Sequence, residues 1–349
     1  MMIKKGKKIV AVLLAVVLAA SMLAGCGGNK AQPSGNAGNT AQSEGQKAAA
    51  KFKVAALLPG PINDGGWNAS AYDGIKKAEK ELGAEIAYRE SVPQSDFEEA
   101  FRAYASQGYN VIIGHGFQFG DAAKKVAKEF PKTTFLITDS RVSQEPNVGS
   151  YSVLAKQAGF LGGALAALMT RSGKVACVGG LSIPPVTDTI EGFKKGVKYV
   201  NPKVEAMTAI TGSFEDVAKA KETARAFIEN GADIIMHNAD QAGLGVIQSA
   251  QEKKILAIGV IKDQSGIAPD TVFVSAYRNI ADGIVYMLKQ VKDGQFKAQF
   301  YPLGVKQNVV GLYWNSQLQS KVPPEVKTKI EQIINDLKEG KIDIDSLPQ

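Results

Sequence analysis

The chain has few of the residues on which metal centres, disulfide frameworks and acid–base catalysis depend. Its 349 residues include two cysteines and two histidines. Paired cysteine spacing, a His-Glu-x-x-His segment and a Gly-x-Ser-x-Gly turn are all missing from the sequence. These absences exclude the common zinc sites and serine-nucleophile motifs. We therefore predict that the protein is not an enzyme and uses no cofactor or metal ion.

A strong excess of charge is also missing. The formal net charge of +7 includes the four lysines within residues 4–8, and removing them leaves 7 − 4 = +3. So small an excess does not predict a nucleic-acid partner. After Cys26 the only thiol is Cys177, so the mature chain cannot form an internal disulfide, and we expect Cys177 to pack inside a strand.

The first 25 residues have the order of a secretory signal peptide, with basic, apolar and small residues in turn. The apolar run from Ile9 to Leu23 is too short to span a hydrocarbon core of about 30 Å comfortably. Leu23-Ala24-Gly25-Cys26 resembles the bacterial lipobox, which predicts a lipid on Cys26 and anchoring at the extracytoplasmic face of the membrane. The alternative is secretion with cleavage nearby and a free Cys26.

Residues 26–50 are predicted to be a flexible tether, because Gly, Asn, Gln, Ser and Ala dominate them and large apolar side chains are almost missing. From Phe52 onward, short apolar runs alternate with amphipathic stretches of helix length. This alternation is typical of parallel sheets covered by helices. Two successive series of such units, from Val54 and from Lys174, predict two similar lobes.

The predicted fold class is α/β, with two lobes that each contain a mostly parallel sheet flanked by helices. The segment after Val260 is too short for a third domain, so we expect it to complete both sheets by crossing between the lobes several times. Multiple crossings form a hinge that can close around a ligand. We assign residues 51–152 and 264–296 to the N-terminal lobe, and residues 153–263 and 297–349 to the C-terminal lobe.

Several ordered segments between about Lys53 and Ile280 resemble the basic membrane protein family of solute-binding lipoproteins. These segments are Pro59 to Asn68 (PGPINDGGWN), Ile113 to Phe119 (IGHGFQF), Ala158 to Gly163 (AGFLGG) and Gly196 to Pro202 (GVKYVNP). The resemblance implies the class I periplasmic-binding-protein fold. It also implies delivery of a purine nucleoside or nucleobase to the permease subunits of an ABC importer, with the chain acting as a monomer.

Two positions bear on the ligand that the resemblance implies. Many nucleoside-binding members carry a Phe-Asn pair after the first strand and an aromatic residue in a Pro-Val turn of the second lobe. This chain has Trp67-Asn68 at the first place, and its segment 185–190 (PVTDTI) has no aromatic residue at the second. The tryptophan is similar to the branch associated with free bases such as adenine.

Candidate ligand-binding residues follow the carboxyl ends of the predicted strands, where open α/β sheets bind their ligands. They are Asn63, Asp64, Trp67, Asn68, Glu90, Phe117, Asp139, Asp188, Asp240 and Asp263. The aromatic pair among them would stack on a flat ring, and Asp139, Asp240 and Asp263 are the leading acceptors for the amine of a base.

Each of these residues has a structural alternative. The alternative for Asp64 is a cap on the first helix, and Asp139 and Asp263 suit strand-to-loop turns. The rings of Trp67 and Phe117 also suit core packing. His115 and His237 are expected to be hydrogen-bonded structural residues, and Arg278, on a late strand, has no assigned role.

Three alternative functions stay open. The same fold would serve a sugar, riboflavin or an amino acid, or a lipoprotein that presents a bound ligand to a membrane receptor. The third alternative is a dinucleotide-binding enzyme, because residues 114–120 (GHGFQFG) imitate a dinucleotide fingerprint. They have, however, one residue too many before the last glycine. Phe117 and Phe119 would also obstruct a pyrophosphate there.

Overall fold

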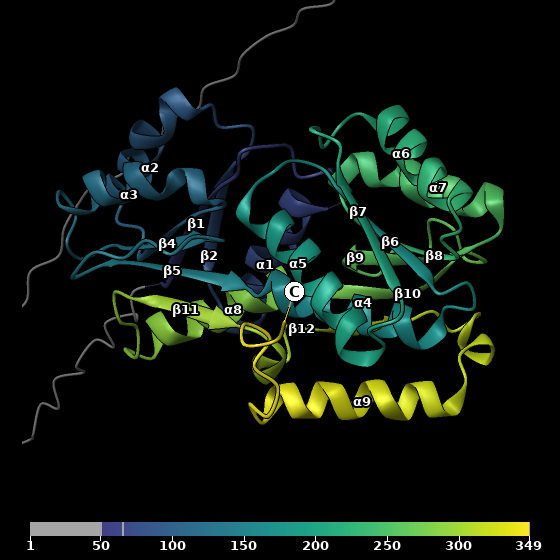
Figure 1. The fold of residues 1–349 in the computed structure, drawn as a ribbon. Coiled ribbons are helices and arrows are strands. Elements are labelled where there is room, and N and C mark those ends of the chain that lie inside the picture. The colour runs from purple at the N-terminus through teal and green to yellow at the C-terminus, as the bar shows by residue number, and fades with distance from the viewer. Residues whose placement is uncertain (1–50, 65, 349) are drawn as a thin grey trace, which may run out of the picture. The chain divides into compact units, whose positions relative to one another are not determined.

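The computed structural model describes residues 51–64 and 66–348 and contains two six-stranded sheets. Helices flank both sheets (Figure 1), and all but one of the strand pairs are parallel. This confirms the predicted two-lobed α/β class. In this described part of the chain, no helix is long and apolar enough to cross a membrane. The predicted signal peptide and tether, residues 1–50, lie outside the described residues.

The N-terminal lobe has the strand order β11-β5-β4-β3-β1-β2. Its elements are β1 (Lys53–Leu57), α1 (Trp67–Leu82), β2 (Glu85–Arg89), α2 (Phe97–Ser106), β3 (Val111–Gly114), α3 (Gly120–Ala127), β4 (Thr134–Thr138), β5 (Val148–Val153), α8 (Ile280–Lys292) and β11 (Phe300–Leu303). The central strands β1 and β3 are fully buried along nearly their whole length because helices cover both faces of the sheet.

The C-terminal lobe has the strand order β12-β10-β9-β8-β6-β7. Its elements are α4 (Ala155–Met169), β6 (Lys174–Gly179), α5 (Pro184–Val200), β7 (Glu205–Ile210), α6 (Val217–Glu229), β8 (Ile234–Asn238), the short 3₁₀ helix η3 (Asp240–Ala242), α7 (Gly243–Lys253), β9 (Leu256–Ile261), β10 (Val272–Arg278), β12 (Val310–Trp314) and α9 (Pro324–Lys338). Only β12 runs antiparallel to its neighbour.

The chain crosses between the lobes after β5, after β10 and after β11. Two late strands therefore differ from the expected lobe ranges: β10 belongs to the C-terminal sheet, and β11 pairs with β5 in the N-terminal sheet. Each of these strands pairs only with strands of the sheet that it joins. Local sequence does not show which sheet edge a strand will join.

The contact between α4 and α5 relies on glycine. A methyl group at Gly159 or Gly163 would overlap a backbone carbonyl of α5, and a methyl group at Gly192 or Gly196 would overlap one of α4. The glycines of the nearly all-apolar helix α4 thus allow the two helices to pack closely. The Pro-Val segment at residues 185–186, expected to form a turn, instead lies in the first turn of α5, which begins at Pro184 because proline suits that position.

Candidate functional site

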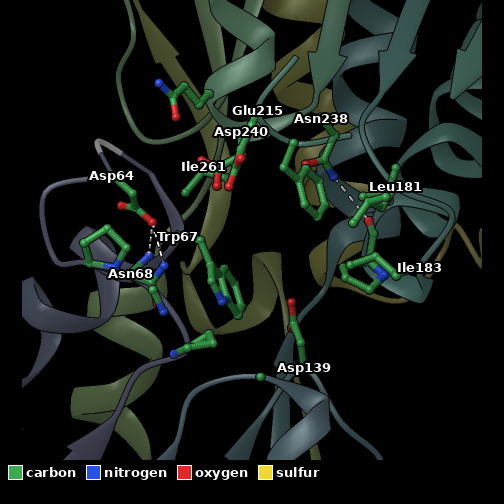
Figure 2. A pocket seen from close by; sticks show the side chains of 18 of the residues that line it. Asp64, Trp67, Asn68, Asp139, Leu181, Ile183, Glu215, Asn238, Asp240 and Ile261 are labelled. Atoms are coloured by element: carbon green, nitrogen blue, oxygen red, sulfur yellow. Dashed lines mark hydrogen bonds between the residues drawn. The ribbon is translucent and has the colours of Figure 1, made fainter. Parts of the chain in front are cut away.

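A cavity of about 820 Å³ lies at the carboxyl ends of strands from both sheets. Its size suits a small ligand. Figure 2 shows the ring of Trp67 projecting into this cavity, with Asp64 and Asn68 on one side and Asp240 on another. The lining residues are Pro59, Gly60, Pro61, Asn63, Asp64, Trp67, Asn68, Gly116, Phe117, Gln118, Asp139, Leu181, Ile183, Pro185, Val186, Phe214, Glu215, Asn238, Asp240, Gln241, Leu244, Ile261 and Arg278.

Trp67 is held by a buried histidine. Its ring stacks on His115 with the centroids 4.0 Å apart and the planes at 20°. The His115 Nε2 atom lies 3.1 Å from the Trp67 carbonyl oxygen, and Nδ1 lies 3.1 Å from the Thr138 hydroxyl. Burial lowers the pKa of His115 to about 3, so the ring is neutral at physiological pH. His115 therefore has the expected structural role, and it orients Trp67 in the cavity.

Asp64 caps the first helix, as one of its two alternatives predicts. Its Oδ1 accepts hydrogen bonds from the amides of Gly66 and Ala69, both at 2.9 Å. Its Oδ2 accepts from the Asn68 amide at 2.7 Å and the Asn68 side chain at 2.8 Å. Four N–H donors occupy this carboxylate, and a negative charge at a helix N-terminus is favourable. Asp64 thus fixes both the helix start and the side chain of Asn68.

Asp139 and Arg278 form a buried ion pair between the lobes. Arg278 Nη2 donates to Asp139 Oδ2 at 2.6 Å and to Oδ1 at 2.9 Å, and the two side chains are only 5% and 6% exposed. Arg278 Nε also donates to the Val153 carbonyl at 2.7 Å. The guanidinium lies 5.9 Å from the Trp67 ring centroid. Arg278, at the end of β10, therefore links the C-terminal lobe to Val153 and Asp139 of the N-terminal lobe.

Asp240 is an acid of the cavity whose pKa is strongly raised. Burial is the larger cause, and the charge of Asp64 is the second; together they raise the pKa of Asp240 to about 7. Glu215 lines the same part of the cavity (Figure 2). The ionisable lining consists of Asp64, Asp139, Glu215 and Asp240 against Arg278 alone, which gives the site a negative excess.

The C-terminal lobe supplies an apolar wall and an amide. Phe214, which follows β7, lines the cavity and packs closely over Gly180, where a side chain would collide with the ring. The amide nitrogen of Asn238 donates to Thr189 Oγ1 at 2.7 Å and to the Pro185 carbonyl at 3.3 Å. Both N–H groups of Asn238 are thereby used, which leaves its carbonyl oxygen as an acceptor.

Three lining residues have left-handed backbone angles. The φ values are 44° for Asp139, 49° for Asp240 and 68° for Ile261. Aspartate tolerates this region, whereas it is unfavourable for a β-branched residue such as Ile261. Non-glycine residues in sparsely populated backbone regions cluster at functional sites because the surrounding structure must hold them there. Three of the six non-glycine residues with positive φ in the described part of the chain therefore line this cavity.

The structure brings most of the predicted site residues together. Asn63, Asp64, Trp67, Asn68, Phe117, Asp139 and Asp240 line the cavity. Phe117 has 46% of its surface exposed, so it is not a core residue. Its second neighbour Phe119 is fully buried.

Three predicted residues lie outside the lining. Glu90 accepts a hydrogen bond from the Ile62 amide at 2.8 Å and so supports the loop before α1. Asp263 accepts from the Ser265 amide at 2.9 Å, which is the turn role left open for it. Asp188 lies in α5 instead of a turn, and burial raises its pKa.

Sequence reasoning missed the apolar wall, because apolar residues at strand ends resemble core residues. Phe214 was not predicted because the family resemblance places the second-lobe aromatic residue within residues 185–190, which form the start of α5. The aromatic ring of the second lobe comes instead from the loop after β7, the neighbouring strand of the same sheet. Its position before a helix and after a strand end was the available signal.

The family model for PnrA-like ABC transporter substrate-binding proteins matches residues 51–343. The chain belongs to this family. Basic membrane protein A2 of Borrelia garinii is 30% identical over 288 residues, covering 80% of this chain and 84% of that protein. The ABC transporter nucleoside-binding protein BmpA of Lactococcus lactis is 27% identical and covers 97% of this chain and 99% of its own length.

Solved structures agree with the family assignment. An ABC transporter solute-binding protein of Conexibacter woesei is 26% identical with a TM-score of 0.71, covering 85% of this chain and 98% of its own. A transcriptional activator of the comK gene from Bacillus halodurans has the same fold, with a TM-score of 0.75, 24% identity, and coverage of 85% of this chain and 100% of its own.

This PnrA-like protein is therefore the substrate-binding component of an ABC transporter and not an enzyme. Such components work outside the cytoplasm, bind a small molecule and deliver it to a permease.

The imitation of a dinucleotide fingerprint at residues 114–120 has a structural explanation. The segment ends β3 and begins α3, and it places one phenylalanine in the core and the other in the cavity.

Proposed function

We propose that this PnrA-like protein binds a purine nucleobase or nucleoside in the cavity between its lobes. The observation that carries the proposal is the pairing of two aromatic residues from opposite lobes, Trp67 and Phe214, in one cavity that is also lined by polar acceptors. A purine needs a flat stacking surface and oriented acceptors for its N–H groups. The nucleoside-binding relative from Lactococcus lactis supports this ligand class.

Stacking on Trp67 is the first component of the proposed binding. One face of its ring is covered by His115, so the other face is the one left for a ligand. Because the histidine is neutral and hydrogen-bonded on both nitrogens, it holds the indole without adding charge to the site. Stacking of a base on an aromatic side chain contributes about 1–3 kcal/mol.

Recognition of the purine edge is the second component. The carbonyl oxygen of Asn238 and the carboxyl of Asp240 are acceptors on the C-terminal lobe. On the N-terminal lobe, Asn68 has its amide oxygen engaged by the Gly60 amide at 3.2 Å and its nitrogen engaged by Asp64. The donors of the ligand are thus expected to face mainly the C-terminal lobe, which would draw the lobes together.

Substitution of Trp67 by alanine is expected to weaken purine binding about 5- to 150-fold, because it removes the stacking free energy. Isothermal titration of ligand-stripped protein with adenine, guanine, adenosine and guanosine would measure this change. Phe214→Ala is expected to weaken the same ligand by a smaller factor within that range.

Tyr88→Ala is the matched control, since Tyr88 is an exposed aromatic residue outside the cavity. Its affinity should equal that of the parent protein. Tight binding of a sugar, riboflavin or an amino acid, with no binding of any purine, would sink the purine assignment and leave the binding-protein class intact.

We also propose that Cys26 carries the lipid that holds the protein at the extracytoplasmic face of the membrane, with residues 1–25 removed and residues 26–50 as tether. The sequence Leu23-Ala24-Gly25-Cys26 supports this proposal. Cys26→Ala is expected to move the protein from the membrane fraction to the medium, or to leave it uncleaved. Fractionation and intact-mass measurement check this, and unchanged membrane retention with normal cleavage would contradict it.

A further inference from the structure

Asp240 lies where the C-terminal lobe meets the loop before α1. It is the first residue of η3, directly after β8, and its left-handed backbone turns the side chain into the cavity. A methyl group placed on Gly66 would collide with Oδ1 of Asp240. The carboxyl of one lobe therefore packs against the main chain of the other, beside Asp64 (Figure 2).

The two acids differ in how they are satisfied. Asp64 has four N–H partners within its own loop and helix, so its carboxylate needs no partner from the opposite lobe. Among residues 51–64 and 66–348, the structure provides no hydrogen-bond donor or cation to the carboxyl of Asp240. The responsive member of the pair is therefore Asp240.

The other ionisable groups around Asp240 do not provide its carboxyl with a counterion or a hydrogen-bond donor. Glu215, from the segment before α6, is also acidic, and Arg278 is already paired with Asp139. The two helices that pack against η3, α6 and α7, place no ionisable side chain in the cavity lining. His237, on the preceding strand, is buried and neutral, with its pKa lowered to about 4.

We propose that Asp240 selects ligands that carry an N–H donor, and that its negative charge keeps the empty cleft from closing. The closed arrangement, in which Asp240 packs against Gly66, is then stable only with a ligand N–H group on the Asp240 carboxylate or a proton on that carboxylate. This inference rests on the proposed function for the identity of the ligand, but its statement about the empty protein does not. This difference in closure would allow the transporter to distinguish a loaded binding protein from an empty one.

The direction of the pH dependence follows from the chemistry of the acceptor. Burial and the charge of Asp64 raise the pKa of Asp240 to about 7, so lowering the pH below 7 protonates it. An N–H donor binds the carboxylate and must displace that proton, so its affinity is expected to fall about tenfold per pH unit below 7. Above pH 7 the affinity should be constant. A ligand that accepts a hydrogen bond from a neutral Asp240 would show the opposite slope.

The empty protein provides the first test. Spin labels or fluorophores on Asp121→Cys and Ala218→Cys would report the distance between the lobes, because both positions lie in first helical turns at the cavity edge of their sheets. We expect ligand-stripped mature protein carrying Cys26→Ala to be more closed at pH 5.5 than at pH 8.5. Asp240→Asn should be closed at both values.

Asp263→Asn is the control, since Asp263 also follows a strand of this lobe but caps its own turn outside the cavity. It should open and close with pH as the parent does. An empty parent protein whose lobe distance ignores pH, or an Asp240→Asn variant that titrates like the parent, overturns the proposal.

The 9-methyl derivatives of adenine, which keeps its amine N–H donors, and of purine, which then has no N–H donor, provide the second test. At pH 8 the parent should prefer the adenine derivative, its affinity for that derivative should fall below pH 7, and both effects should shrink at least threefold in Asp240→Asn. Affinity for the adenine derivative that rises as the pH falls overturns the N–H selection. If no purine binds at all, the purine assignment fails, and the lobe-distance measurement alone decides the role of Asp240.

Discussion

Replacement of Arg278 by methionine is expected to lower the free energy of unfolding by about 3–5 kcal/mol, because it leaves the buried carboxylate of Asp139 without its counterion. The Val153 carbonyl loses a donor in the same variant. Urea denaturation of the mature chain carrying Cys26→Ala would measure the change. The loss should appear as a lower midpoint with an unchanged slope, since the folded state keeps its surface.

Two further variants show whether the ion pair is the cause. Arg278→Met combined with Asp139→Asn should regain at least half of the lost stability, because no unpaired charge then stays buried. Arg225→Met removes an exposed pair with Glu229 one helical turn away, and it should cost at most about 0.5 kcal/mol. A loss below about 1 kcal/mol in the single Arg278 variant would mean that water reaches Asp139.

Gly163→Ala is expected to destabilise the C-terminal lobe by about 3 kcal/mol or more. The added methyl group would overlap the carbonyl oxygen of Phe193, and because the obstacle is backbone, no side-chain rotation can relieve it. The helices α4 and α5 would have to separate along a contact where Gly196 likewise approaches the Phe160 carbonyl. Thermal or urea unfolding of the variant provides the measurement.

Helix propensity opposes the expected destabilisation, so the two possible causes predict changes in stability of opposite sign. Alanine favours a helix interior over glycine by about 1 kcal/mol, so a variant as stable as the parent would show that the helices do not touch at this point. Gly266→Ala is the control, because nothing lies within contact distance of its added methyl group. Its stability should stay within about 0.5 kcal/mol of the parent.

The positions of strands and helices could be predicted from the sequence wherever burial of one face requires apolar residues at regular spacing. The apolar runs and amphipathic stretches that alternate after Phe52 correspond to the strands and helices of the two sheets. The start of α5 did not follow, because Pro184 and Pro185 suggested a turn. Proline in fact suits the first turn of a helix, where its missing N–H group costs nothing.

The candidate site was predicted best where family resemblance and strand-end logic coincided. Trp67, Asn68 and Phe117 lie in the resembling segments after strand ends, and all three line the cavity. Asp263 satisfies the rule but not the geometry, because its carboxyl turns back to its own loop. A strand end offers several residues, and the direction of each side chain depends on backbone angles that sequence does not display.

The sequence alone determined the fold class, the two series of strands and helices, and the set of polar and aromatic residues at strand ends, because each depends on local periodicity and residue chemistry. Only the tertiary structure decided that β11 joins the first sheet, that Arg278 pairs with Asp139, and that Asp240 faces Gly66. These are contacts between segments far apart in the chain. Their geometry is set by how two lobes pack across the crossings, which no local pattern encodes.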